Sequence, residues 1–215
     1  VMGPAHVQNV ADLACRTALP YRGVAHINFP VDLQELEDGE RSKRNVADHT
    51  SHVLACRARL PADEDLVRAA QILNAGKKIA ILCGQGALNA TDQLEEAAEV
   101  LGAPIVKALL GKAAVPDDSS YTTGGIGLLG TKPSQEVLEE CDTLLMIGTS
   151  FPYIEFLPKP GQARGVQIDL DPARIGLRYP VEIGLVGDSR NTLLPLLGHL
   201  KRQEDRSFLE KARAG

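Results

Sequence analysis

The chain has 215 residues, and its 44% hydrophobic content is enough for the core of one domain with additional segments. Its 23 basic and 28 acidic residues give a net charge of −5 without a dense basic stripe, so no nucleic-acid partner is expected. No apolar stretch approaches the roughly 20 residues of a transmembrane segment, and no charged-then-apolar leader opens the chain, so we expect a soluble, cytoplasmic protein.

Residues 1–38 contain a predicted helix and strand without a sheet of their own. Apolar residues at helical spacing predict the helix over residues 7–18, and residues 23–29 are typical of a strand that ends at Pro30. Residues 39–60 are polar and are therefore predicted to be a linker. The basic run at residues 41–44 is typical of such a solvated linker, and contact with an anionic partner is the alternative.

Residues 61–200 alternate between amphipathic helices and short aliphatic runs. Asp63 and Ser134 are predicted to cap two of the helices. The predicted helices cover residues 63–73, 91–101, 134–141 and 192–200. The predicted strands cover residues 78–82, 105–106, 144–147, 166–168 and 183–186, with a long loop over 108–123. Aliphatic runs without polar alternation indicate a mostly parallel sheet covered by helices on both faces. Residues 201–215 are charged and are predicted to be a linker to a further domain.

The first predicted strand of this domain ends in a pair of glycines, Gly84 and Gly86. Glycines at a strand end let a phosphate approach backbone N–H groups, so a nucleotide-shaped ligand is the first hypothesis. The third glycine of the dinucleotide fingerprint is replaced by Asn89, which disfavours a standard NAD site. The alternative is that the two glycines only make a tight turn.

Two aspartates follow another predicted strand. Asp169 is placed to accept ribose hydroxyls, and Asp171 is predicted to cap the segment that begins at Pro172. A metal site formed by so short a segment is the less favoured alternative.

Two aromatic residues, Phe151 and Tyr153, follow the strand that ends at Gly148. Such a pair either covers the flat ring of a ligand or fills a loop core beside Phe156, and the composition leaves both hypotheses open.

Four cysteines are spread along the chain without a Cys-x-x-Cys pair: Cys15, Cys56, Cys83 and Cys141. Neither a zinc site nor a disulfide framework is indicated, and buried free thiols are expected. Cys83 lies in the candidate ligand loop, where a packed small residue is favoured over a reactive thiol.

Together these motifs resemble the central domain of thiamine-diphosphate enzymes. They lie in order at residues 79–86, 111–112, 148–153, 167–176 and 186–188. The resemblance is greatest to pyruvate oxidases and quinone-linked pyruvate dehydrogenases, with acetolactate synthase more distant. Residues 18–34 resemble the end of the preceding pyrimidine-binding domain, so the resemblance covers nearly the whole chain.

The resemblance implies an α/β fold with a six-stranded, parallel, Rossmann-like sheet and, in the oxidase branch, a site for the ADP half of FAD. By motif position, the pyrophosphate would lie near Gly84 and Gly86, with Leu109 and Lys112 in the loop beside it. The flavin side would be flanked by Gly127, Leu128 and Leu129, and the nucleotide closed over by Gly148, Thr149 and Phe151. Ribose and adenine would be held by Asp169 and Ile175, with Asp188 near the adenine. Where several relatives carry a basic residue, this chain has Ala87-Leu88-Asn89, so charge support is expected from Lys112, Lys107 or the backbone.

The resemblance also implies that the thiamine-activating glutamate and the metal-binding segment belong to flanking domains. We therefore expect an excised middle portion with no catalytic residue or metal ligand of its own. In the full-length enzyme, thiamine diphosphate and Mg²⁺ would be bound by flanking pyrimidine- and diphosphate-binding domains, and electrons from a 2-oxo acid such as pyruvate would pass to FAD. That enzyme would be at least a homodimer. A flavin-free structural domain of a decarboxylase or synthase and a free-standing nucleotide-binding domain are the alternatives.

Overall fold

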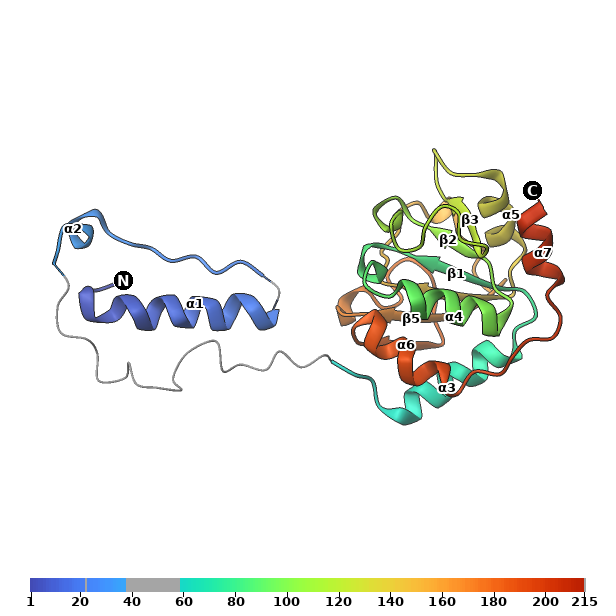
Figure 1. The fold of residues 1–215 in the computed structure, drawn as a ribbon, viewed down its shortest axis with the longest axis horizontal. Coiled ribbons are helices and arrows are strands. Elements are labelled where there is room, and N and C mark those ends of the chain that lie inside the picture. The colour runs from blue at the N-terminus through green and yellow to red at the C-terminus, as the bar shows by residue number, and fades with distance from the viewer. Residues whose placement is uncertain (22, 38–58, 215) are drawn as a thin grey trace. The chain divides into compact units, whose positions relative to one another are not determined.

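The computed structural model describes residues 1–21, 23–37 and 59–214 (Figure 1). These residues belong to two compact units, Val1–Arg57 and Ala58–Gly215. Most of the predicted linker over residues 39–60, together with Cys56, lies outside the described residues. Among the helices that are described, none combines the length and the apolar character needed to cross a bilayer.

The first unit contains a short 3-10 helix, Pro4–His6, followed by α1 (Val7–Tyr21) and the single turn α2 (Val31–Gln34). The predicted helix is therefore confirmed and continues to Tyr21. The predicted strand over residues 23–29 is wrong, because the chain there pairs with no other strand among the described residues. Val24, near its start, is 98% exposed. An isolated extended segment has no ladder to stabilise it, however strand-like its composition.

The second unit is built on a six-stranded sheet, and all of its strand pairs are parallel. The strands are β1 (Ile79–Cys83), β2 (Ile105–Lys107), β3 (Thr122–Gly125), β4 (Thr143–Ile147), β5 (Arg164–Asp169) and β6 (Ile183–Val186). Their order across the sheet is β3-β2-β1-β4-β5-β6. The predicted six-stranded parallel α/β fold is confirmed.

Helices cover both faces of this sheet, because its central strands are apolar on both sides. The helices are α3 (Asp63–Ala75), α4 (Thr91–Leu101), α5 (Lys132–Glu140), α6 (Ser189–Leu197) and α7 (Ser207–Ala214). One core cluster joins α3, α4 and α6 to side chains such as Ile81 and Leu145. The second cluster joins α5 and α7 to their strand neighbours Leu82 and Leu144 on the opposite face. Adjacent residues of a strand point to opposite faces, which is why aliphatic runs without alternation fit here.

Strand β3 was not predicted, because it lies at the end of the expected loop over residues 108–123. Its residues Thr-Thr-Gly-Gly form no aliphatic run, and all four are only partly buried at the edge of the sheet. The loop before it contains a 3-10 turn, Leu109–Gly111.

Two predicted helix caps are wrong. Asp63 is the first residue of α3, and its N-cap Ala62 makes no side-chain cap. Thr131, not Ser134, caps α5: its hydroxyl accepts from the backbone N–H of Ser134. The closing helix begins earlier than predicted, at Ser189.

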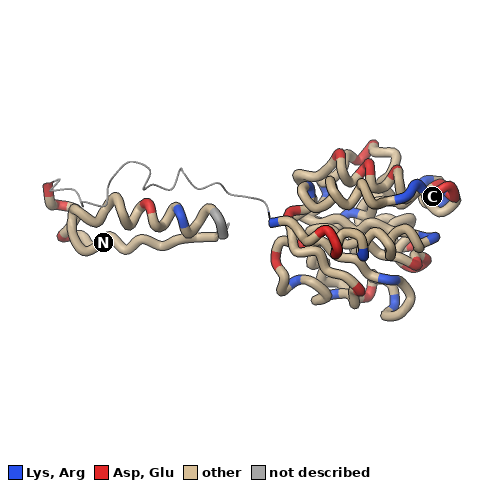
Figure 2. Tube along the Cα trace, turned by 90° about the horizontal axis from the view of Figure 1, so that it is seen from below, with Lys and Arg blue, Asp and Glu red and all other residues tan. Residues whose placement is uncertain are grey.

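The segment from residue 201, which the sequence predicts to be a linker to a further domain, packs on the folded unit. The backbone N–H of Gln203 donates to the carbonyl of Val100 at 2.8 Å. The Arg206 guanidinium donates to the backbone carbonyl and the carboxylate of Glu99, both at 2.7 Å. Phe208 is buried against α5. The apolar side chains of Phe208 and Leu209 are both buried and dock α7 on the domain. Acidic and basic residues are interspersed along this unit (Figure 2).

Replacing Phe208 with Ala tests whether this segment belongs to the domain. Because Phe208 is 8% exposed, the loss of its packing should lower the free energy of unfolding by about 2–4 kcal/mol. Urea unfolding monitored by circular dichroism measures the change. The exposed Leu194→Ala change on α6 is the control, and equal effects of the two substitutions would contradict the docking of α7.

Candidate functional site

The sheet order reverses direction between β1 and β4. The chain adds β2 and β3 on one side of β1 and then crosses back to add β4, β5 and β6 on the other side. In open parallel sheets, ligands bind at the carboxyl edge near this reversal. Every predicted site residue lies at or beyond the carboxyl end of one of the six strands. The fold therefore brings the predicted residues to one edge of the sheet.

Four glycines form a cluster at this edge, which we call the glycine cluster: Gly84, Gly86, Gly111 and Gly148. A Cβ atom on Gly84 would lie 2.6 Å from the carbonyl oxygen of Gly148. One on Gly111 would lie 2.6 Å from the carbonyl oxygen of Cys83. Gly148 has φ +55°, and a Cβ there would lie 2.5 Å from Cα of Gly86. The loops after β1, β2 and β4 thus touch through their backbones, which only glycine permits.

The first two glycines are more than a tight turn, but their amides are already used. The N–H of Gly84 donates to Ile147 O and that of Gly86 to Gly148 O, both at 2.9 Å. These two N–H groups are therefore engaged within the protein. What Gly86 offers a ligand is an exposed surface without a side chain.

The two aromatic residues after β4, Phe151 and Tyr153, have different environments. Phe151 is buried in the core with Phe156 packed against the same cluster, so it fills the loop core as one hypothesis predicted. Its ring also lies 3.6 Å from the position of a Cβ on Gly127, which brings the loops after β3 and β4 together. Tyr153 packs edge-on against Phe151 with 5.5 Å between ring centroids and is 45% exposed. Thr149 is buried and accepts the N–H of Phe151.

Asp169 is a buried carboxylate at this edge. It is 5% exposed, and its Oδ1 accepts the N–H of Asp171 at 3.0 Å. Its Oδ2 is buried and has no hydrogen-bond partner among the residues that the structure describes. Burial raises the pKa of Asp169 by penalising the charged form. Asp171 caps the turn at Pro172 by accepting the N–H of Ala173, as predicted.

A polar side chain of β5, that of Gln167, holds the loop that follows this strand, a role that was not predicted. The Gln167 side chain donates to Arg174 O and accepts from Gly176 N, which fixes the turn carrying Ile175. Gln167 is a polar residue within an aliphatic strand, and this feature of the sequence could have indicated its structural role.

Asp188 has a structural role that was not predicted. It caps α6 by accepting from the backbone N–H and the side chain of Asn191, at 3.1 and 3.0 Å. It also accepts from the Asn89 side chain at 3.3 Å. Asn89, which replaces the fingerprint glycine, thus ties the loop after β1 to the end of β6.

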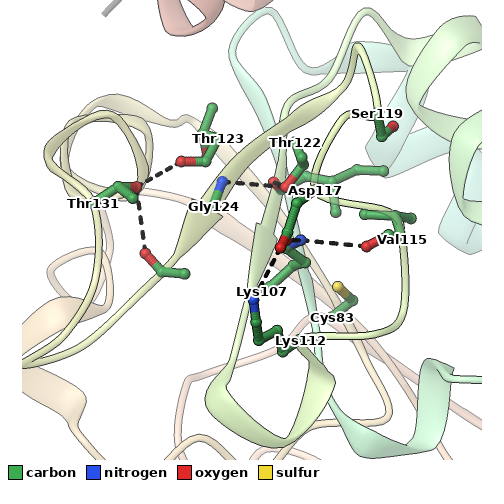
Figure 3. A network of polar contacts seen from close by, with 12 residues as sticks. Cys83, Lys107, Lys112, Val115, Asp117, Ser119, Thr122, Thr123, Gly124 and Thr131 are labelled. Carbon is green, nitrogen blue, oxygen red and sulfur yellow. Dashed lines mark hydrogen bonds and ion pairs between the residues drawn. The ribbon is translucent and has the colours of Figure 1, made fainter.

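The two lysines expected to support a pyrophosphate share one counter-ion (Figure 3). The Asp117 carboxylate accepts from both Lys107 and Lys112. These hydrogen bonds, that from Lys107 first, lower the pKa of Asp117 to about 2. Four leucines, Leu109, Leu110, Leu128 and Leu129, lie exposed on the neighbouring loops.

Cys83 and Cys141 are buried, as expected, whereas Cys15 is exposed, which corrects its expected burial. Burial raises the pKa of Cys83 to about 12, so its thiol stays protonated, as expected for a packed residue. Within the described residues, no three side chains among His, Cys, Asp and Glu are grouped closely enough to hold a metal ion.

Comparison with known sequences identifies the family of this chain. A family model described as the central domain of thiamine pyrophosphate enzymes matches residues 66–196. "Putative thiamine pyrophosphate-containing protein YdaP" of Bacillus subtilis is 45% identical over 91% of this chain and 33% of its own length. Pyruvate oxidase of Lactiplantibacillus plantarum is 29% identical over 93% of this chain and 33% of its own length.

A solved structure shares the fold. It is described as a "putative thiamin diphosphate-dependent enzyme" from Mycobacterium smegmatis, with a TM-score of 0.73, 24% identity and coverage of 96% of this chain and 39% of that chain. This chain thus spans about a third of the length of both named relatives.

Gly148→Ala tests the backbone contact in the glycine cluster. A residue with a side chain in the left-handed region costs about 1–2 kcal/mol, and the clash with Gly86 adds to this, so we expect a total loss of at least about 3 kcal/mol in stability. Gly161→Ala is the matched control, because Gly161 has φ +84° and nothing within 4 Å of the added Cβ. Chemical denaturation compares the two variants. Equal losses would mean that the contact with Gly86 contributes nothing.

Asp169→Asn tests whether the buried carboxylate opposes folding. Since its pKa is raised in the folded state, the unfolded chain ionises first as pH rises from about 3.9, and stability falls until pH passes the folded pKa. Asn removes this penalty and keeps an acceptor for the Asp171 N–H. We expect the variant to be more stable at pH 7 by about 1 kcal/mol, with the difference vanishing near pH 3. Thermal melts at both pH values measure it. A variant less stable at pH 7 would refute the penalty.

Proposed function

The chain belongs to the thiamine pyrophosphate enzyme family as a central domain, and on this premise we propose that its carboxyl edge anchors the ADP half of FAD in a 2-oxo acid oxidase or dehydrogenase. Thiamine diphosphate and Mg²⁺ belong, in this proposal, to flanking pyrimidine- and diphosphate-binding domains of a homo-oligomeric enzyme. The resemblance to pyruvate oxidases supports pyruvate as the model substrate.

The observation that carries the proposal is the Oδ2 of Asp169 at the carboxyl end of β5, which is buried and has no hydrogen-bond partner within the described part of the chain. A buried carboxylate oxygen without a donor is unfavourable unless a ligand supplies one. Ribose hydroxyls are donors of the right kind, and a carboxylate after a strand of this sheet type is their usual acceptor. In this arrangement Asp169 accepts from the ribose, and Ile175, on the turn held by Gln167, packs beside the adenine.

The neighbouring loops suit the rest of an ADP group. The exposed, side-chain-free surface of Gly86 admits the diphosphate, and Gly84 and Gly148 hold that surface in place. Leu109 and Lys112 lie on the loop that Gly111 presses against Gly84. Thr149 and Phe151 support the loop that closes over the nucleotide, and Asp188 positions the end of β6 near it.

The flavin ring has an apolar surface to pack on. Gly127 leaves room beside Phe151, and Leu128 and Leu129 are 80% and 94% exposed on the same loop. An exposed apolar pair of this size is typical of a contact surface. When bound, FAD supplies the electron acceptor for the oxidised substrate. The residues of this chain bind and orient it and exclude water from its apolar face.

A flavin-free scaffold is the second candidate function. It is favoured by the amides of Gly84 and Gly86, which are satisfied within the protein, and by the Asp188 carboxylate, which caps α6. In that case the same edge would serve only to join the flanking domains.

Calorimetric titration of FAD, ADP and NAD into the chain tests the proposal. FAD and ADP should bind, and Asp169→Ala should weaken both by about tenfold or more, because it removes the acceptor of the ribose hydroxyls. Asp171→Ala is the matched control, because Asp171 is exposed and caps only a single turn. Preference for NAD, or equal affinities of the Asp169 and Asp171 variants for ADP, would contradict the assignment. A full-length enzyme that purifies without flavin would favour the scaffold.

A further inference from the structure

Lys107 is a buried cation at the carboxyl end of β2. Its side chain is 3% exposed, and its ammonium group donates to Val115 O at 3.3 Å and to the Asp117 carboxylate. Removing a charge from water is unfavourable unless it is paired, so Lys107 depends on an anion at this position. In the structure that anion is Asp117, from the exposed turn after Pro116 (Figure 3).

The same carboxylate also pairs with Lys112. The Lys112 ammonium lies 2.9 Å from Asp117 Oδ2, and both side chains are largely exposed, at 70% and 68%. One carboxylate therefore bridges two ammonium groups and leaves an excess of one positive charge among the three. Such an arrangement accommodates an anion with more charge than a carboxylate carries.

The lysine pair lies beside the glycine cluster. Lys112 follows Gly111, which lies so close to the backbone of Cys83 and Gly84 that an added Cβ would be 2.7 Å from the α-carbon of Gly84. Lys107 continues β2 next to Cys83 of β1, with which it is in register. An anion that replaced the Asp117 carboxylate would thus lie at the carboxyl edge of the sheet beside β1 and β2, next to the glycine cluster.

We propose that Lys107 and Lys112 form an anion subsite for the diphosphate of the nucleotide, and that Asp117 is a resident counter-ion which the diphosphate displaces. This inference rests on the proposed function, and it identifies Asp117 as the group that controls the affinity for the diphosphate. Because Asp117 is exposed, its side chain can turn into water when the diphosphate takes over both lysines. A nucleoside without phosphate cannot make this exchange and gains nothing from the subsite.

The competing interpretation is that Asp117 only clamps its loop in the binding conformation. The two interpretations predict opposite effects of Asp117→Asn. A displaced counter-ion competes with the ligand, so its neutralisation tightens binding of a diphosphate. A clamp supports the ligand loop, so its neutralisation weakens binding. The Asn carbonyl keeps one acceptor for the buried Lys107.

The experiment is calorimetric titration of inorganic pyrophosphate, ADP and adenosine into the full 215-residue chain and its variants. Asp117→Asn should bind pyrophosphate and ADP about tenfold more tightly, with adenosine unchanged. Asp118→Asn is the matched control, because it removes the same charge from the adjacent exposed position and should change affinity less than about threefold. Lys112→Gln should weaken pyrophosphate about tenfold, and its exposed position keeps it informative if the Asp117 variant does not fold.

The outcomes separate this inference from the proposed function. Pyrophosphate that binds the Asp117 variant no more tightly than the original chain, or that binds neither, overturns the counter-ion exchange. Unchanged affinity in Lys112→Gln also overturns it. Tighter pyrophosphate binding without any gain for ADP over pyrophosphate supports the exchange and contradicts the nucleotide site.

Discussion

The backbone contact between the loops after β1 and β4 is the constraint on which the candidate site depends. Gly84 and Gly86 lie against Gly148, and the hydrogen bonds between these loops involve only backbone atoms. Because no side chain separates them, the two loops leave the sheet at its reversal point as one unit. Gly111 adds the loop after β2 to that unit. The packing of the glycines thus determines the shape of this edge, and therefore the surface that a ligand could contact.

The polar residues of this edge divide into two groups. Asn89, Gln167 and Asp188 have their hydrogen-bonding groups engaged by neighbouring loops and hold the scaffold. Asp169, by contrast, keeps one buried oxygen without a partner among the described residues, and Asp117 pairs with two lysines through an exposed side chain. In the proposed function, a bound nucleotide would compensate the charges at both positions.

The sheet could be predicted because five of its strands are aliphatic runs buried on one or both faces. Strand β3 could not, since Thr122–Gly125 pairs at an edge and has no hydrophobic signal. The strand prediction over residues 23–29 was wrong for the opposite reason. Their composition suits a strand, but a strand also needs a pairing partner, which composition does not reveal. The docking of residues 201–214 was not predicted, because it involves the packing of Phe208 against α5. Local sequence patterns do not reveal such a tertiary contact. Glycine positions were predictable, but the use of their amides inside the protein was visible only in three dimensions.

The proposal that a nucleotide binds at the carboxyl edge is tested by mapping backbone amide chemical shifts during an ADP titration. We expect the shifted amides to lie on the loops that follow β1, β2, β4 and β5, with the largest changes near Gly86, Lys112 and Asp169. Shifts confined to the amino-terminal edge of the sheet or to α5 and α7, or no saturable shifts at all, would contradict it.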